Sequence, residues 1–253
     1  MVGDAVGRSG RQVIVNLVPK LRRELELDMV IANGENAAAG RGLTLSVAEE
    51  FLGAGVDVIT SGNHIWDQKD IIPYLDGQLP ILRPLNYPSG APGRGMLQMG
   101  NVTVINLQGR VFMNNIDCPF RAADQVLAAL PPHSIVIVDF HAEATSEKMA
   151  LGWYLDGRVS AVVGTHTHIA TADTRVLPRG TAFVCDVGMT GARDSIIGDV
   201  IDDVLQRCLT GMPVRLQPAT GPAVLNSVLI DVDDETGRAR RIERVDREII
   251  DAK

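Results

Sequence analysis

The stretch VSAVVGTHTH (159–168) is a short, apolar, β-rich run that ends in a polar cluster. The same pattern recurs in VIANGEN (30–36), DVITSGNH (57–64) and SIVIVDFHAE (134–143). Helical patterns alternate with these runs, at residues 11–27, 47–54, 121–130 and 146–155. Short buried strands that alternate with helices are typical of layered proteins, so the sequence predicts an α/β fold.

The two ends of the chain add detail to this prediction. Near the carboxyl end, SVLIDV (227–232) and ARRIERV (239–245) flank Asp-Asp-Glu-Thr-Gly, which predicts a β-hairpin. At the start, only two residues precede Gly3-Asp4, so we expect the strand that leads into this motif to be truncated. No repeat, linker or low-complexity segment interrupts the chain, and we expect a single domain over residues 1–253.

The composition excludes several classes of protein. The 253 residues include 24 Lys and Arg against 31 Asp and Glu, a formal net charge of −7. This balance argues against stable nucleic-acid binding, which takes a surplus of basic residues. Cys118, Cys185 and Cys208 form no C-x-x-C pair, which argues against a disulfide framework or a thiolate zinc site. Without an apolar run of roughly 18–20 residues or a leader pattern, we expect a soluble, cytoplasmic protein with no membrane partner.

Polar clusters follow the predicted strands, at Gly3-Asp4, Asn33–Asn36, Ser61–His64, Asp139–His141 and Gly164–His168. Open α/β sheets bind ligands outside the carboxyl ends of their strands. The candidate donors there are Asp4, Glu35, Asn36, Asn63, His141, His166 and His168. Oxygen and imidazole donors without thiolates suit Fe, Mn, Zn or Co. This set is too large for one four-coordinate ion, whereas two ions about 3.5–4 Å apart would use all of it and activate a bridging hydroxide.

Each cluster, taken alone, also has an ordinary structural explanation. Gly3-Asp4 and Asn33-Gly34 could each form a turn. Asn63-His64 could begin a helix, and His141 could be a hydrogen-bonded core histidine. These explanations are weak together, because none of them says why so many strand ends share one set of donors. The two acidic donors would also be unstable in a buried site without a cation.

The order of these motifs resembles that of calcineurin-like metallophosphoesterases. Longer strings are similar to the YmdB-like branch of bacterial cyclic-nucleotide phosphodiesterases: ANGENAAAGRGLT (32–44), SGNHIWD (61–67), GRVFM (109–113), DCPFRAAD (117–124), DFHAEATSEK (139–148), DGRVSAVVGTHTH (156–168) and TADTRVLPRGTAFVCDVGMTG (171–191). The resemblance extends from the first residues to about position 215. It implies a four-layer α/β/β/α sandwich around a dinuclear centre.

The resemblance also implies a role for each site residue. One ion would be held by Asp4, Glu35, Asn36 and His168, and the other by the shared Glu35 with Asn63, His141 and His166. Iron is the foremost metal implied, with manganese, zinc or a mixed pair as alternatives. His64 would be the proton donor to the leaving oxygen and not a ligand, a role that suits an imidazole near neutral pH.

The substrates of the resembling family are 2′,3′-cyclic nucleotides, opened at the 2′ bond to give 3′-nucleotides. The chain is therefore expected to be a metal-dependent phosphodiesterase acting on small cyclic nucleotides or phosphate esters, and to form a homodimer or homotetramer. Two other functions stay open: a broad phosphomonoesterase or RNA-end phosphatase, and a regulatory protein linked to nucleotides or RNA with weak catalysis.

Base recognition is harder to predict. Phe112, Met113, Phe120 and Arg121 follow a predicted strand, where a substrate-facing loop could lie. Aromatic side chains there could stack on a base, but burial in the core is the commoner role of such residues. We therefore interpret them, together with Trp66 and Trp153, as packing residues.

Overall fold

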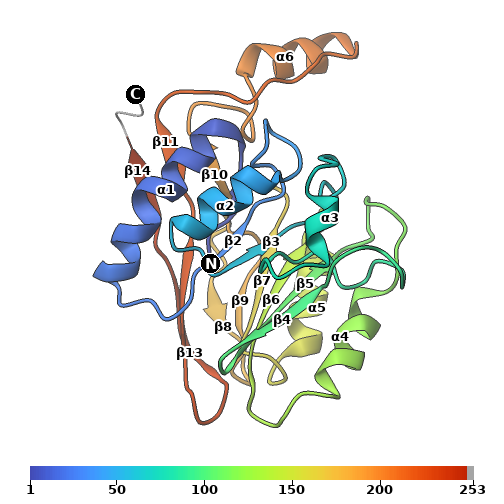
Figure 1. Ribbon diagram of the computed structural model, residues 1–253, viewed down its shortest axis with the longest axis vertical. Helices are drawn as coiled ribbons and strands as arrows, with labels where there is room; N and C mark the ends of the chain where they lie inside the picture. Colours follow the sequence, from blue (N-terminus) through green and yellow to red (C-terminus); the bar gives the residue numbers. More distant parts are fainter. Residues whose placement is uncertain (250–253) are drawn as a thin grey trace.

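The protein has a mixed α/β fold, as the alternating sequence pattern predicts (Figure 1). The computed structural model describes residues 1–249. The helices are α1 (Gly7–Glu24), α2 (Leu45–Gly53), α3 (Ile72–Leu75), α4 (Pro119–Leu127), α5 (Thr145–Leu155) and α6 (Ile201–Thr210). Within the described residues, none of these helices combines the length and the apolarity that crossing a bilayer would take.

The largest sheet has six strands, in the order β4-β5-β6-β7-β9-β8. Their bounds are β4 (Met96–Met99), β5 (Val102–Gln108), β6 (Ile135–His141), β7 (Ala161–Thr165), β9 (Ala182–Val184) and β8 (Arg175–Val176). Parallel pairing joins β5, β6, β7 and β9, whereas β4 and β8 pair antiparallel at the two edges. The carboxyl ends of the parallel strands therefore meet at one edge of the sheet.

A second group of strands consists of three smaller sheets. They are β1 (Asp4–Ala5) with β10 (Met189–Ala192), β11 (Ala223–Leu225) and β14 (Arg247–Ile249); β2 (Ile31–Asn33) with β3 (Val58–Thr60); and β12 (Val228–Val232) with β13 (Ala239–Arg244). Val2 bridges to both Ala32 and Ser227, which links the three sheets. The predicted hairpin near the carboxyl end is confirmed in β12 and β13. β1 begins at Asp4 itself, after the position where the truncated strand was expected, and Val2 forms bridges.

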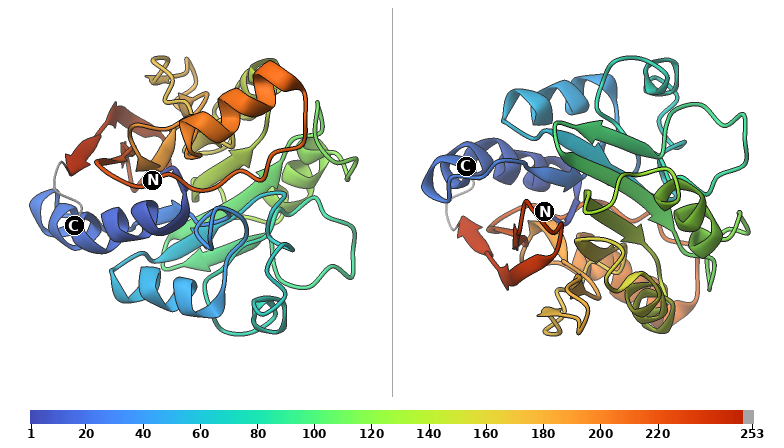
Figure 2. Two further views of the ribbon diagram at one scale, coloured as in Figure 1. Left: turned by 90° about the horizontal axis from the view of Figure 1, so that it is seen from above. Right: turned by 90° about the horizontal axis from the view of Figure 1, so that it is seen from below.

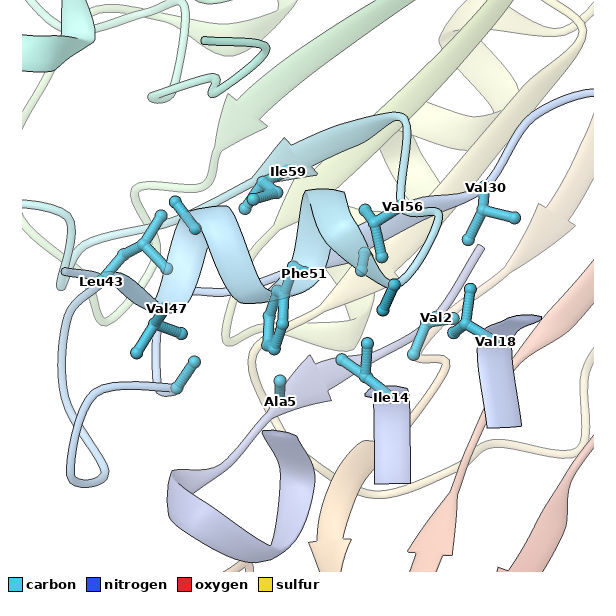
Figure 3. Close-up of a cluster of buried hydrophobic side chains, with 14 of the residues drawn as sticks. Val2, Ala5, Ile14, Val18, Val30, Leu43, Val47, Phe51, Val56 and Ile59 are labelled. Atoms are coloured by element: carbon cyan, nitrogen blue, oxygen red, sulfur yellow. The ribbon is translucent and has the colours of Figure 1, made fainter. Parts of the chain in front are cut away.

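Three apolar clusters stabilise this arrangement. The first packs α1 and α2 against the second group of strands, with Phe51 of α2 and Ile59 of β3 among its members (Figure 3). The second packs the six-stranded sheet against the opposite helices, with Phe140 of β6 and Leu151 of α5 among its members. The third contains valines and isoleucines from both groups of strands and joins them. Figure 2 shows α1 and α2 on one side of the strands and α4 and α5 on the other.

Helix α1 differs from its predicted bounds of 11–27, because it begins and ends earlier, at Gly7–Glu24. Its first turn buries Gly7 and Gly10, which carry no apolar periodicity, so the sequence pattern begins one turn late. A Cβ at Gly10 would lie 2.3 Å from the Thr190 carbonyl oxygen, so the missing side chain allows α1 to pack closely on β10. Pro19 lies inside the helix and does not end it.

Candidate active site

The predicted donors meet at strand ends from both groups, at carboxyl ends in every case except Asp4, which is the first residue of β1. Asp4 lies in β1, Glu35 and Asn36 follow β2, Asn63 and His64 follow β3, His141 ends β6, and His166 and His168 follow β7. This is the edge at which open α/β sheets bind ligands. A cavity of about 650 Å³ contains none of these residues; its lining includes Val102 and Ile135, which begin β5 and β6 at the opposite end.

Three of the predicted ligands, Glu35, His141 and His166, form a compact cluster whose donor atoms lie within 4.8 Å of one another. His141 Nε2 is 3.0 Å from Glu35 Oε1, 3.0 Å from His166 Nδ1 and 3.2 Å from Asn63 Oδ1. Carboxylate, imidazole and amide donors thus converge on one small volume. This set has the donor types and spacing to hold one transition-metal ion.

The other predicted ligands are connected to this cluster through Glu35 and His166. Asn36 Nδ2 is 3.2 Å from Glu35 Oε1 and 3.0 Å from His168 Nε2. Asp4 is fully buried, and its Oδ2 accepts a hydrogen bond from the backbone N–H of His166 at 3.1 Å. Its Oδ1 has no hydrogen-bond partner within residues 1–249. An unpaired buried carboxylate oxygen is costly, and a second cation would satisfy it.

Burial and mutual charge shift the pKa values in this cluster. Burial raises the pKa of Asp4. Burial also opposes the ionisation of Glu35, but the adjacent His141 outweighs it and lowers the pKa of Glu35 to about 2. In His141, burial disfavours the charged ring, yet the charge of Glu35 raises its pKa to about 9. The cluster therefore requires positive charge, which a proton on His141 or a bound cation in its place can supply.

Each of the four histidines at the site has one ring nitrogen within hydrogen-bonding distance of an oxygen atom. His64 Nδ1 is 2.9 Å from Asp67 Oδ2, His141 Nδ1 is 3.0 Å from Thr165 Oγ1, His166 Nε2 is 3.0 Å from Glu143 Oε2, and His168 Nδ1 is 2.7 Å from the Ile197 carbonyl oxygen. Partners of this kind orient metal-binding imidazoles and select the nitrogen that faces the ion. His166 accordingly presents Nδ1 to the cluster, whereas His141 and His168 present Nε2.

Asp139 is a supporting residue of its polar cluster, in which the sequence pattern identified only His141 as a candidate donor. It is fully buried and accepts hydrogen bonds from the hydroxyls of Thr60 and Thr165 and from Asn33 Nδ2. It therefore orients Thr165, whose hydroxyl meets His141. A signal was present, because residues two apart in a strand share a face and Asp139 stands two positions before His141.

A buried ion pair supports the loop that carries His166 and His168. Both histidines have positive φ, +100° and +65°, a conformation that residues with side chains rarely adopt. Between them, Thr167 donates to Asp186 Oδ2 from its backbone N–H at 3.0 Å and from its hydroxyl at 2.8 Å. Lys148 Nζ lies 2.7 Å from the same oxygen, and both charged side chains are 1% exposed. The pair thus helps to hold the loop in its strained conformation.

Gly62 allows the cluster to form. A Cβ at this position would lie 2.1 Å from His141 Cδ2 and 2.4 Å from Glu35 Oε2, so a side chain there would occupy the space of the donors. The residues present fit metal ions on three grounds. The donors are oxygen and imidazole, Asp4 Oδ1 is unpaired in the described chain, and the backbone at Gly62 leaves the donors room to converge.

Known proteins resemble this chain along nearly all of its length. The family model described as "YmdB-like protein" matches residues 1–245. The chain belongs to the YmdB-like family. A 2′,3′-cyclic-nucleotide 2′-phosphodiesterase from Bacillus subtilis (strain 168) is 47% identical over 249 residues, which cover 96% of this chain and 94% of that protein. The family resemblance predicted from the motifs is therefore confirmed.

Two solved structures share the fold of this YmdB-like chain. A hypothetical protein from Thermus thermophilus matches with a TM-score of 0.92 at 43% identity, covering 98% of this chain and 97% of the other. A structure described as a novel phosphatase from Mycoplasma pneumoniae matches with a TM-score of 0.93 at 32% identity, covering 99% and 93%.

Removing the charge of Lys148 is expected to destabilise the protein. Lys148→Met keeps the length of the side chain but leaves the Asp186 carboxylate buried without its cation, so we expect a loss of about 3–5 kcal/mol in the free energy of unfolding. Urea unfolding followed by circular dichroism measures it. The double variant Lys148→Met/Asp186→Asn should recover part of the loss. An unchanged unfolding midpoint for Lys148→Met would contradict the role of this pair.

Proposed function

We propose that this YmdB-like protein is a dinuclear, metal-dependent phosphodiesterase that opens 2′,3′-cyclic nucleotides at the 2′ bond to give 3′-nucleotides. The observation that carries the proposal is the position of Glu35 Oε1, 3.0 Å from His141 Nε2 and 3.2 Å from Asn36 Nδ2, so that one carboxylate joins two donor groups. The name of the 47% identical Bacillus subtilis relative supports the substrate class.

The two donor groups define the two proposed metal sites. One consists of Asp4, Glu35, Asn36 and His168, and the other of Glu35, Asn63, His141 and His166. Iron is the foremost candidate, followed by manganese, zinc or a mixed pair, because oxygen and imidazole donors accept all of these. Two bound cations would neutralise the phosphoryl oxygens and make a water molecule nucleophilic near neutral pH.

His64 is the proposed proton donor to the departing ribose oxygen. Its backbone N–H donates to Glu35 Oε2 at 3.2 Å, which fixes the residue beside the shared carboxylate. Its Nδ1 is 2.9 Å from Asp67 Oδ2, so its Nε2 is left for the substrate. An alkoxide is a poor leaving group, and a positioned acid that protonates it typically contributes about 10²–10⁴ in rate.

We further propose that the fold is the four-layer α/β/β/α sandwich of metallophosphoesterases, built as a single domain in the cytoplasm. The three apolar clusters support the layers, because four layers require three interfaces. The last residues of the predicted domain, 250–253, lie outside the described chain.

Metal content and turnover, measured on one sample, test the proposed centre. We expect about two ions per chain by elemental analysis and hydrolysis of 2′,3′-cAMP that a chelator abolishes. Glu35→Gln removes the shared charge at nearly constant size, so ions and turnover should be lost together. One ion or fewer per chain in the wild type, or normal turnover in Glu35→Gln, would contradict the two-ion site.

A substrate panel separates this function from the two alternatives. The proposed enzyme should prefer 2′,3′-cAMP to 3′,5′-cAMP and to p-nitrophenyl phosphate. Equal or faster hydrolysis of p-nitrophenyl phosphate would favour a broad phosphomonoesterase, a function that the name of the 32% identical Mycoplasma pneumoniae phosphatase supports. A metal-loaded protein without any turnover would favour a regulatory role.

Loss of the His64 imidazole is expected to separate metal binding from turnover. His64→Ala should retain the ions, because its ring belongs to neither donor group, and should lose about 10²–10⁴ in kcat. Asp67→Asn, which keeps the imidazole and weakens its orientation, should lose less. Elemental analysis and steady-state kinetics measure both effects. Equal kcat values for the wild type and His64→Ala would eliminate the proton-donor role.

We propose that the protein forms a homodimer or homotetramer through α6. Ile201, Leu205 and Leu209 share one face of this helix and are 42%, 45% and 84% exposed, while α6 projects from the body (Figure 1).

A charge on the apolar face of α6 is expected to dissociate this assembly. Leu205→Glu should shift the molar mass from light scattering to that of one chain, because a carboxylate in an apolar contact loses its hydration. Gln206→Glu introduces the same charge at an exposed position beside this face and should leave the mass unchanged. A single-chain mass for the wild type would contradict self-association.

A further inference from the structure

The loop between β5 and α4 exposes an aromatic side chain. Phe112 is 88% exposed, and its φ of +62° lies in the left-handed region that phenylalanine rarely adopts. The interpretation of Phe112 as a packing residue is therefore wrong, and Trp153, at 45% exposed, and the exposed Arg121 are further exceptions. Phe120 and Trp66 do pack against the core clusters. A strained and exposed aromatic residue calls for a functional explanation.

The loop conformation is set by two buried polar side chains. Glu147 accepts hydrogen bonds at 3.1 Å from the two backbone N–H groups that precede Phe112. Asn86 donates at 2.8 Å to carbonyl oxygens on both sides of the loop, at residues 108 and 117. Phe112 is therefore presented by a backbone that is anchored at both ends.

Backbone pairing at the start of the loop connects it to the candidate active site. Gln108, the last residue of β5, is paired with His141, the last residue of β6, and the backbone N–H of Gly109 donates to the His141 carbonyl oxygen at 2.9 Å. Glu147 lies in the first turn of α5, directly after the segment that follows His141. The loop, the green segment between β5 and α4 in Figure 1, thus leaves the sheet at the edge that carries the donors.

We propose that Phe112 is a stacking platform for the nucleobase of the substrate. This inference rests on the proposed function, because a cyclic nucleotide extends beyond its phosphate to a planar base. A phenyl ring offers an apolar face and no hydrogen-bonding group, so it holds any base with little preference. Stacking on one aromatic side chain raises affinity about 5- to 150-fold. The metal cluster and the loop would thus bind opposite ends of the substrate.

Paired substrates test the platform by steady-state kinetics of the metal-loaded protein. One is 2′,3′-cAMP, and the other is methyl riboside 2′,3′-cyclic phosphate, which has the cyclic phosphate but no base. In Phe112→Ala, KM for 2′,3′-cAMP should rise about 5- to 150-fold with kcat near the wild-type value. The constants for the base-free substrate should not change. Phe112→Trp should keep the low KM, and Trp153→Ala, an exposed aromatic residue near the far end of α5, is the matched control.

Calorimetric titration with 3′-AMP separates this inference from the proposed function. If the wild type does not hydrolyse 2′,3′-cAMP, the proposed function fails, whereas weaker 3′-AMP binding by Phe112→Ala still supports the platform. Equal 3′-AMP affinity in the two proteins, or an equal rise of KM for both substrates, overturns it. A lower molar mass of Phe112→Ala in light scattering also overturns it and assigns Phe112 to a contact between copies.

Discussion

Two buried carboxylates, Asp4 and Glu35, lie beside imidazoles at the point where the two groups of strands meet. A carboxylate removed from water is stable only if positive charge or hydrogen bonds replace its hydration. Glu35 meets this requirement through His141, whereas Asp4 Oδ1 has no hydrogen bond within the described chain and lies 3.8 Å from His141 Nδ1. The need for positive charge at one place explains why so many imidazole and amide donors surround these carboxylates, and why Gly62 contributes no side chain there.

The fold supplies this site by ending its strands at one edge. β1, β2 and β3 come from the second group of strands and β6 and β7 from the six-stranded sheet, so the donors approach from two sides of the apolar cluster between them. Beneath the donors, Asp139 and the Lys148–Asp186 pair are buried and hydrogen-bonded. Exclusion of water strengthens these interactions, which lets a few residues hold His166 and His168 in conformations that a free loop would not keep.

The site divides its tasks between strand ends and loops. The donors lie at strand ends or within a few residues of them, where the ladder of backbone hydrogen bonds restrains them. Two residues proposed to contact the ribose and the base lie on loops: His64 after β3 and Phe112 after β5. A backbone hydrogen bond connects each loop to a donor residue, Glu35 in the first case and His141 in the second. Membership in the YmdB-like family agrees with this arrangement, because a metal ion that acts on a phosphate ester would need rigid ligands, while recognition of the remaining substrate can be provided by loops.

Residue types and their spacing along the chain were enough to predict the α/β class, the polar residues at the strand ends and the family. These are local properties, and the periodicity of apolar residues and the order of motifs such as His166-Thr167-His168 express them directly. The hydrogen-bond partners of the donors were not predictable in this way, because Thr165 meets Asp139 and Lys148 meets Asp186 across long stretches of chain. The early start of α1 and the exposure of Phe112 also escaped prediction. Burial and pairing depend on which distant segments pack together, and composition within a segment does not encode that.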